Sequence, residues 1–147
     1  MSKMQRTKGQ TGEREVCAIL RQELGMEVRR NWQAQSAGGG ADIVLPGWAI
    51  EVKRAKVLRI GPWWTQAAIQ AQASGLMPLL VYRPDRGSWV ARMSLFDLRP
   101  DLGCHHQVEM ALACWCNFYR VLNADTRVVQ ITECQGQPVR GQHWWHA

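Results

Sequence analysis

Two acids and a lysine stand in an otherwise apolar stretch, GGGADIVLPGWAIEVKR, at residues 38–54. If Pro46 and Gly47 form a two-residue turn, the strands on either side pair so that Asp42 falls opposite Glu51. Alternate residues of a strand share a face, so Lys53 lies on the face that carries both acids. The opposite face carries an apolar set: Ile43, Leu45, Trp48, Ile50 and Val52. The sequence therefore predicts two carboxylates and an ammonium group at one end of a hairpin.

Like charges directly opposite each other destabilise a sheet, so a positive group is expected between the two acids. Lys53 alone would make a structural ion-pair cluster. A divalent metal is the second interpretation, because two carboxylates and a backbone carbonyl suit Mg²⁺, which retains several water ligands. The hairpin by itself leaves both interpretations open, and a longer turn at Pro46 would shift the register.

A third acid lies in the first predicted helix. Val16, Leu20 and Leu24 form an apolar stripe at helical spacing, and Glu13 stands three residues before Val16 on the same stripe. Glu15 points elsewhere. Acids are common in a first helical turn because they complement the helix dipole. An inward-facing acid needs a partner, however, and the acidic end of the hairpin is a candidate.

The elements that must position these residues follow from periodicity and from turn residues. Residues 1–10 are expected to form a flexible basic arm, followed by a helix from Thr11 or Gly12 to about Leu24 that Gly25 ends. The expected strands are Met26–Trp32, Asp42–Leu45, Trp48–Arg54, Leu79–Arg83, Ser88–Met93 and Arg127–Thr132. Further helices are expected from Pro62 to near Gly75 and over Met110–Leu122.

Composition and charge narrow the class of protein. The 147 residues favour one domain with a real core. The net charge is +6, with 11 Lys/Arg against 6 Asp/Glu in residues 1–60 and 7 against 6 in the remainder. A basic first half suggests a polyanionic partner, usually nucleic acid, although solubility alone is the alternative. No apolar run is long enough to span a bilayer, and the polar N-terminus lacks a secretory signal, so we expect a cytoplasmic protein without a membrane partner.

The motifs together resemble a known nuclease superfamily. The series Lys8-Gly9-x-x-x-Glu13-Arg14, Gly40-Ala41-Asp42-Ile43, Ile50-Glu51-Val52-Lys53 and Gln66 resembles the PD-(D/E)XK nucleases. Within that superfamily it is most similar to the archaeal-type Holliday junction resolvases and related phage nucleases. Ala41 stands where the proline of the motif's name would be. The resemblance implies a single α/β domain with a restriction-endonuclease-like mixed β-sheet flanked by helices. Residues 11–95 would be the nuclease core, and residues 96–147 an extension packed on it.

The resemblance also implies roles for individual residues. Asp42, Glu51 and the Val52 carbonyl would hold Mg²⁺, for which Mn²⁺ could substitute, and Lys53 would assist the attacking water. Glu13 would complete the site, and Gln66 would support it, with Gln70 one turn later. Ser36 would lie where the loop approaches DNA. A phosphate track could be lined by basic residues, each of which is by itself more often a solvated charge: Lys8, Arg29, Arg30, Arg54, Lys56 and Arg59.

The expected activity is Mg²⁺-dependent hydrolysis of DNA phosphodiester bonds by an endonuclease selective for branched DNA. Two symmetric cuts at a four-way junction would require a homodimer with one site for each strand. We expect a bacterial or phage-encoded protein without a small-molecule cofactor. Three alternatives stand beside it: a catalytically idle nucleic-acid-binding module, a nicking or repair nuclease of the same fold, and an assembly protein with another acidic partner. The intact Asp42, Glu51 and Lys53 favour an enzyme.

Trp63 and Trp64 open the second predicted helix. Adjacent residues of a helix cannot both face the core, so one of the two is expected to be exposed or at an interface. A role in stacking on bases or in wedging DNA open is one interpretation. Packing within the protein is the other.

Overall fold

A five-stranded mixed sheet organises the protein. The computed structural model describes residues 3–32, 39–103 and 105–134. The strands are β1 (Ile43–Leu45), β2 (Trp48–Ala55), β3 (Met77–Pro84), β4 (Val90–Ser94) and β5 (Gln107–Ala111), and they are ordered β1-β2-β3-β4-β5 in the sheet. β2 and β3 are parallel, and each of the other neighbouring pairs is antiparallel. The parallel pair needs a crossover, which the helix α3 (Ile60–Ser74) supplies.

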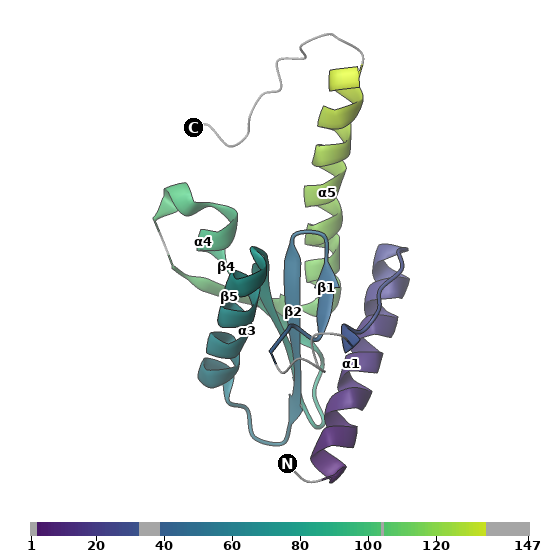
Figure 1. The fold of residues 1–147 in the computed structure, drawn as a ribbon, viewed down its shortest axis with the longest axis vertical. Helices are drawn as coiled ribbons and strands as arrows, with labels where there is room; N and C mark the ends of the chain where they lie inside the picture. Colours follow the sequence, from purple (N-terminus) through teal and green to yellow (C-terminus); the bar gives the residue numbers. More distant parts are fainter. Residues whose placement is uncertain (1–2, 33–38, 104, 135–147) are drawn as a thin grey trace.

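Helices cover both faces of this sheet (Figure 1). The helices α1 (Lys3–Leu24) and α5 (Leu112–Cys134) pack on one face, where a single apolar cluster includes Val16, Leu20, Ile50 and Trp115. α3 packs on the other face through small residues, with Ala71 against Ala49 and Ala67 against Leu80. The expected α/β class, a mixed sheet flanked by helices, is confirmed.

The β1–β2 hairpin has the register that the sequence predicts. Ile43 pairs with Ile50, Val44 with Ala49 and Leu45 with Trp48, so Pro46 and Gly47 form a two-residue turn. Gly47 has a φ of 81°, which an L-residue with a side chain rarely adopts. The predicted apolar face is buried in the main core: Ile43, Leu45, Trp48, Ile50 and Val52. This register puts Asp42 and Glu51 at the next opposed position, just beyond the paired residues.

The first helix is longer than predicted. It begins at Lys3, so residues 3–10 are helical and do not form the flexible arm expected from their polarity. Thr11 is not a cap, because its hydroxyl donates to the Thr7 carbonyl one turn earlier within the helix. A glycine inside a helix costs only about 1 kcal/mol, so Gly9 does not stop a helix that its C-terminal half anchors to the core.

Residues 26–32 do not form the predicted strand. A single bridge joins Arg30 to Ile43, and the Asn31 amide donates to the Asp42 carbonyl at 2.8 Å. The segment nevertheless alternates like a strand, because Val28 and Arg30 are buried while Arg29 is exposed. Only Ile43, the first of the three residues of β1, pairs with this segment, so no second ladder forms on that edge.

The C-terminal part belongs to the same core. β5, which the sequence analysis did not predict, pairs with β4 at the edge of the sheet. Leu112, Trp115 and Tyr119 of α5 join the main apolar cluster. α5 runs to Cys134, so the strand predicted at Arg127–Thr132 is wrong. Extending an established helix adds one hydrogen bond per residue, which outweighs the small strand preference of Val and Ile.

The remaining predictions agree closely with the structure. α3 begins two residues before Pro62 and ends at Gly75, whose φ is 65°. The predicted hairpin after it corresponds to β3 and β4. Within the described ranges, no helix is long and apolar enough to cross a membrane.

Candidate active site

Glu51 is the centre of a polar cluster under α3. It lies on the β2 face that α3 covers, and only 3% of the residue is exposed. Lys53, two residues along the same strand face, places its Nζ 2.6 Å from Glu51 Oε1. Gln66 of α3 donates through Nε2 to the same oxygen at 2.8 Å. Strand alternation and one helical face thus bring three sequence-predicted residues together.

Asp42 lies across the hairpin end from Glu51. Its Oδ2 accepts a hydrogen bond of 2.8 Å from the Val52 amide. Burial and, to a smaller extent, the negative charge of Glu51 raise the pKa of Asp42 from 3.8 to about 7, although the hydrogen bond from the Val52 amide opposes the shift. A carboxyl group with this pKa is half protonated near neutral pH. Ionisation of Asp42 is therefore unfavourable beside the negative charge of Glu51.

The two acids share one electrostatic environment. Burial also raises the pKa of Glu51, although the Lys53 ammonium group works against that shift. The one ammonium group of Lys53 therefore does not fully offset the buried Glu51 and the partly buried Asp42. A structural ion-pair cluster would be expected to keep both acids ionised. Here the pKa values of both acids are raised, so an additional cation would stabilise their ionised forms.

The oxygens of the cluster fit a hard divalent cation. Glu51 Oε2 is buried and accepts no hydrogen bond of ordinary geometry from the described residues, while the Gln70 side chain, one turn after Gln66, acts on the Glu51 carboxylate and helps to lower its pKa. The Val52 carbonyl points to the same strand edge as its amide, toward Asp42, because both groups of one strand residue face one side. Among the described residues, no three His, Cys, Asp or Glu side chains are arranged to hold a metal. A site here would thus consist of two carboxylates, a backbone carbonyl and water, which is the donor set that Mg²⁺ accepts.

Glu13 reaches the cluster from α1 but has a partner of its own. It is 8% exposed, and its Oε2 accepts from Arg30 Nε at 2.6 Å. Its charge still helps to raise the pKa values of both Asp42 and Glu51. Glu13 is therefore inward and near the acids, as predicted, while Arg30 balances its charge.

Arg30 does not have the position expected of a phosphate contact. It is 8% exposed, its guanidinium lies 4.2 Å from the centre of the Trp32 ring, and it pairs with Glu13. A buried guanidinium held by a carboxylate is not available to a DNA backbone. Its inward position was readable from alternation, since Val28 two residues earlier is apolar and buried.

The other predicted DNA contacts differ in their surroundings. Arg29 is exposed and pairs with Glu27 at 2.9 Å, while Lys56 and Arg59 are exposed in the loop after β2. Arg54 is partly buried and pairs with Glu15 at 3.2 Å. Ser36 and the side chain of Lys8 lie outside the described residues.

A network that sequence reasoning missed surrounds Glu15. Besides Arg54, this carboxylate binds Arg83 NH2 at 2.8 Å, and the Arg83 guanidinium stacks 4.7 Å from the centre of the Trp89 ring. The register Arg54↔Arg83 on the parallel strands places the two guanidinium groups side by side. The pairing of distant strands creates this contact, and no local signal could have revealed it.

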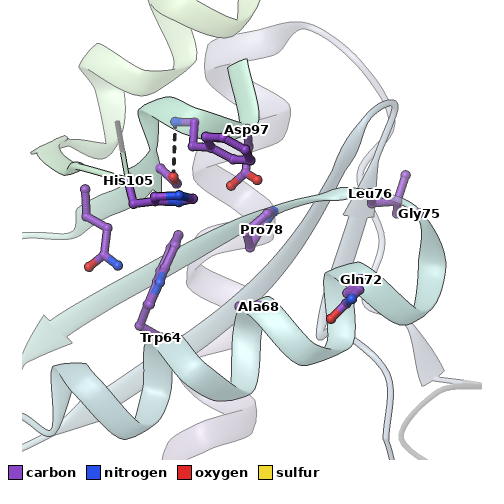
Figure 2. Close-up of a pocket in the computed structure, with 11 residues that line it drawn as sticks. Trp64, Ala68, Gln72, Gly75, Leu76, Pro78, Asp97 and His105 are labelled. Atoms are coloured by element: carbon purple, nitrogen blue, oxygen red, sulfur yellow. Dashed lines mark hydrogen bonds between the residues drawn. The ribbon is translucent and has the colours of Figure 1, made fainter. Parts of the chain in front are cut away.

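A cavity of about 510 Å³ lies on the opposite flank of α3 from the acids. Figure 2 shows Trp64, Ala68 and Gln72, one helical turn apart, lining it from α3, with Asp97 and His105 across the opening. Gln66 faces the other way, toward Glu51. Asp42 and Glu51 are not among the lining residues, so this cavity is separate from the acidic cluster.

We predict that Asp42→Asn stabilises the metal-free protein at high pH. Because folding raises the pKa of Asp42 from 3.8 to about 7, the folded protein binds the proton more tightly. The stability that this carboxyl contributes is complete below about pH 4 and is lost as pH rises through 7. In EDTA, the variant should unfold at a higher urea concentration than the parent at pH 8.5, by on the order of 2 kcal/mol, and the gap should close toward pH 4.

Glu27→Gln is the control for this measurement, because Glu27 is fully exposed and its pKa is lowered rather than raised. If the difference in unfolding free energy between the parent and Asp42→Asn did not change with pH, the pKa of Asp42 would not be raised by folding.

Comparison with known proteins identifies the family. The family model described as "Phage putative PDDEXK endonuclease" matches residues 4–106, more than half of the chain. Protein D14 of Escherichia phage T5 is 30% identical over 115 residues, which cover 63% of this chain and 72% of D14. The solved structure of Hjc from Archaeoglobus fulgidus, a Holliday junction resolvase, is 24% identical, covers 54% of this chain and 70% of its own, and gives a TM-score of 0.42. On the family match, this chain belongs to the phage PDDEXK endonucleases.

Proposed function

We propose that this protein is a divalent-metal-dependent DNA endonuclease. The observation that carries the proposal is the acidic cluster, in which a partly buried Asp42 opposes the buried Glu51 and the surroundings raise the pKa of both carboxyl groups. The endonuclease description of the family agrees with this chemistry. Phosphodiester hydrolysis requires an activated water and charge relief on the phosphate oxygens, and both can be supplied here.

The residues divide the work as their positions suggest. Asp42, Glu51 and the Val52 carbonyl would hold Mg²⁺, or Mn²⁺ in its place. When bound, the ion supplies charge relief at the phosphate and lowers the pKa of a water ligand. Lys53, held 2.6 Å from Glu51, can orient the attacking water and stabilise hydroxide through its positive charge. Gln66 of α3 donates a hydrogen bond to Glu51 Oε1, which restricts the orientation of the carboxylate and so of Glu51 Oε2.

A catalytically idle binding module is the principal alternative, and the electrostatics argue against it. An idle module gains nothing from two opposed carboxyl groups whose pKa values are both raised by their surroundings. Replacing either acid by an amide would relieve the repulsion while leaving the basic surface for DNA. Retention of the strained pair is typical of a site whose charges serve chemistry.

We predict that DNA cleavage requires both a divalent metal ion and the acidic cluster of Asp42, Glu51 and Lys53. Supercoiled and linear DNA should be cut with Mg²⁺ or Mn²⁺ and remain intact in EDTA. Asp42→Asn and Lys53→Gln should each lower the cleavage rate by about 10²-fold or more, with DNA affinity within a few fold of the parent. Glu27→Gln and Arg86→Gln, which change exposed charges, are the matched controls and should cut normally. Full activity in EDTA would exclude the metal site.

The second prediction separates the two acids of α1. Glu13→Gln should lower cleavage by about tenfold or more and raise the Mg²⁺ concentration needed for half-maximal activity, because Glu13 influences both cluster acids. Glu15→Gln should leave that concentration unchanged, because Glu15 binds Arg54 and Arg83 instead. Both variants are compared at a temperature where circular dichroism shows them folded. Equal shifts in the Mg²⁺ requirement would refute the distinction.

The third prediction concerns branched DNA and assembly. The described residues of each chain form one such acidic cluster, and two symmetric cuts at a four-way junction need two clusters. We therefore propose a homodimer on such DNA. Light scattering with catalytically blocked Asp42→Asn and a junction should give the mass of the junction plus about twice the 16.7 kDa chain mass. A junction, fork and linear duplex of equal length, cut in parallel with Mg²⁺, measure the preference. A monomer on the junction together with equal cutting of all three would favour a nicking nuclease.

A further inference from the structure

The loop between β2 and α3 exposes two consecutive aliphatic side chains. Val57 is 69% exposed and Leu58 is 40% exposed. In the part of the chain that the structure describes, they are the one pair of exposed large apolar residues adjacent in sequence. Lys56 precedes them and Arg59 follows, and both of these basic residues are exposed as well. The loop therefore presents an apolar tip between two cations.

This loop directly follows the strand that carries the candidate catalytic residues. β2 ends at Ala55, and Val57 is four residues beyond Lys53. Four extended residues span at most about 14 Å, which corresponds to roughly four base steps of a DNA strand. Figure 1 shows the loop at the end of the sheet where α1 also begins, and the first residues of that helix include Lys3, Arg6 and Lys8 in the sequence. A DNA strand cut at the acidic cluster would pass within reach of the loop.

The tryptophans next to the loop do not compete for this role. Trp63 and Trp64 are partly buried and pack against the cluster of Ala67, Leu80 and Tyr82. Of the two interpretations that the sequence left open for the pair, the structure supports packing. Between β2 and this end of α3, the exposed large apolar side chains are therefore Val57 and Leu58 of the loop.

The chemistry of the loop selects DNA as the occupant. Aliphatic side chains can enter between base steps and unstack them, at a cost of a few kcal/mol for each step in intact duplex. That cost is smallest where stacking is already interrupted, as at a branch point. Cations on both sides of the apolar pair match the phosphates that flank such a step. An apolar protein partner would have no need of them.

We propose that residues 56–59 form a wedge that recognises interrupted base stacking within about four base steps of the scissile phosphate. Val57 and Leu58 enter the opened step, and Lys56 and Arg59 bind the phosphates on either side. The inference rests on the proposed function in taking DNA as the substrate, and it assigns the preference for branched DNA to this loop. Its test uses binding without cleavage, so that the two proposals can fail separately.

The experiment compares the double variant Val57→Ser/Leu58→Ser with Ile69→Ser/Val121→Ser, which removes two aliphatic side chains of similar exposure, 63% and 61%, from other surfaces. The probes are a four-way junction with 2-aminopurine at the branch and a linear duplex of the same composition, both in EDTA. The parent should raise the fluorescence of the junction on binding. The loop variant should lose that rise and bind the junction about tenfold or more weakly, while duplex affinity stays within a few fold. The control pair should behave like the parent.

The flanking cations give an independent readout. Lys56→Gln and Arg59→Gln should weaken binding to the junction and to the duplex alike, and each should reduce the slope of log affinity against log salt by about 0.9. The serine variant of the loop should leave that slope unchanged, because it removes no charge.

Three results would overturn the wedge: equal losses on junction and duplex, an unchanged fluorescence rise in the loop variant, or the same effects from the control pair. If the parent cuts DNA but the loop variant keeps its junction preference, the wedge alone fails. If the parent shows the predicted binding and fluorescence but never cuts with Mg²⁺, the proposed endonuclease activity fails and the wedge stands. A parent that does not bind DNA overturns both.

Discussion

The opposition of Asp42 and Glu51 under α3 is the constraint on which the rest of the structure depends. Two carboxylates at one end of a hairpin repel each other, and burial raises the pKa of both. The cluster therefore exists only because neighbouring elements hold it in place. Lys53 and Gln66 hold one Glu51 oxygen, the Val52 amide holds Asp42, and the apolar opposite face anchors the strand in the core.

The surrounding charges form two separate balances. Glu13 pairs with Arg30 inside the fold, so a third acid approaches the cluster without adding an uncompensated charge. Glu15, two residues along the same helix, pairs with Arg54 and Arg83 at the ends of the parallel strands. The Glu13–Arg30 pair affects the electrostatics of the acidic cluster, whereas the ion pairs of Glu15 connect α1 to β2 and β3. A buried carboxylate and a partly exposed one on one helix thus have different consequences.

The two ends of the strand β2 differ in what surrounds them. The C-terminal end of β2, the loop at residues 56–59 and the beginning of α1 lie at one end (Figure 1), and the sequence of these segments includes Lys3, Arg6, Lys53, Lys56 and Arg59. The tight β1–β2 turn lies at the other end of the strand. A polyanion attracted to this end would contact the loop first and the acidic cluster next, because both lie along β2 and the loop that follows it. Recognition and the proposed hydrolysis would then depend on adjacent residues of the chain.

The sequence by itself determined the local features of this protein. Strand alternation and the Pro46-Gly47 turn predicted the hairpin register, its apolar face and the meeting of Asp42 with Glu51, because these depend on residues close in the chain. Helical spacing likewise predicted the inward position of Glu13. Tertiary structure decided what involved distant segments: the pairing of Arg30 with Glu13, the network around Glu15, and the addition of β5 to the sheet. It also decided the extents of α1 and α5, because a helix that the core holds over part of its length extends beyond the core with one added hydrogen bond per residue.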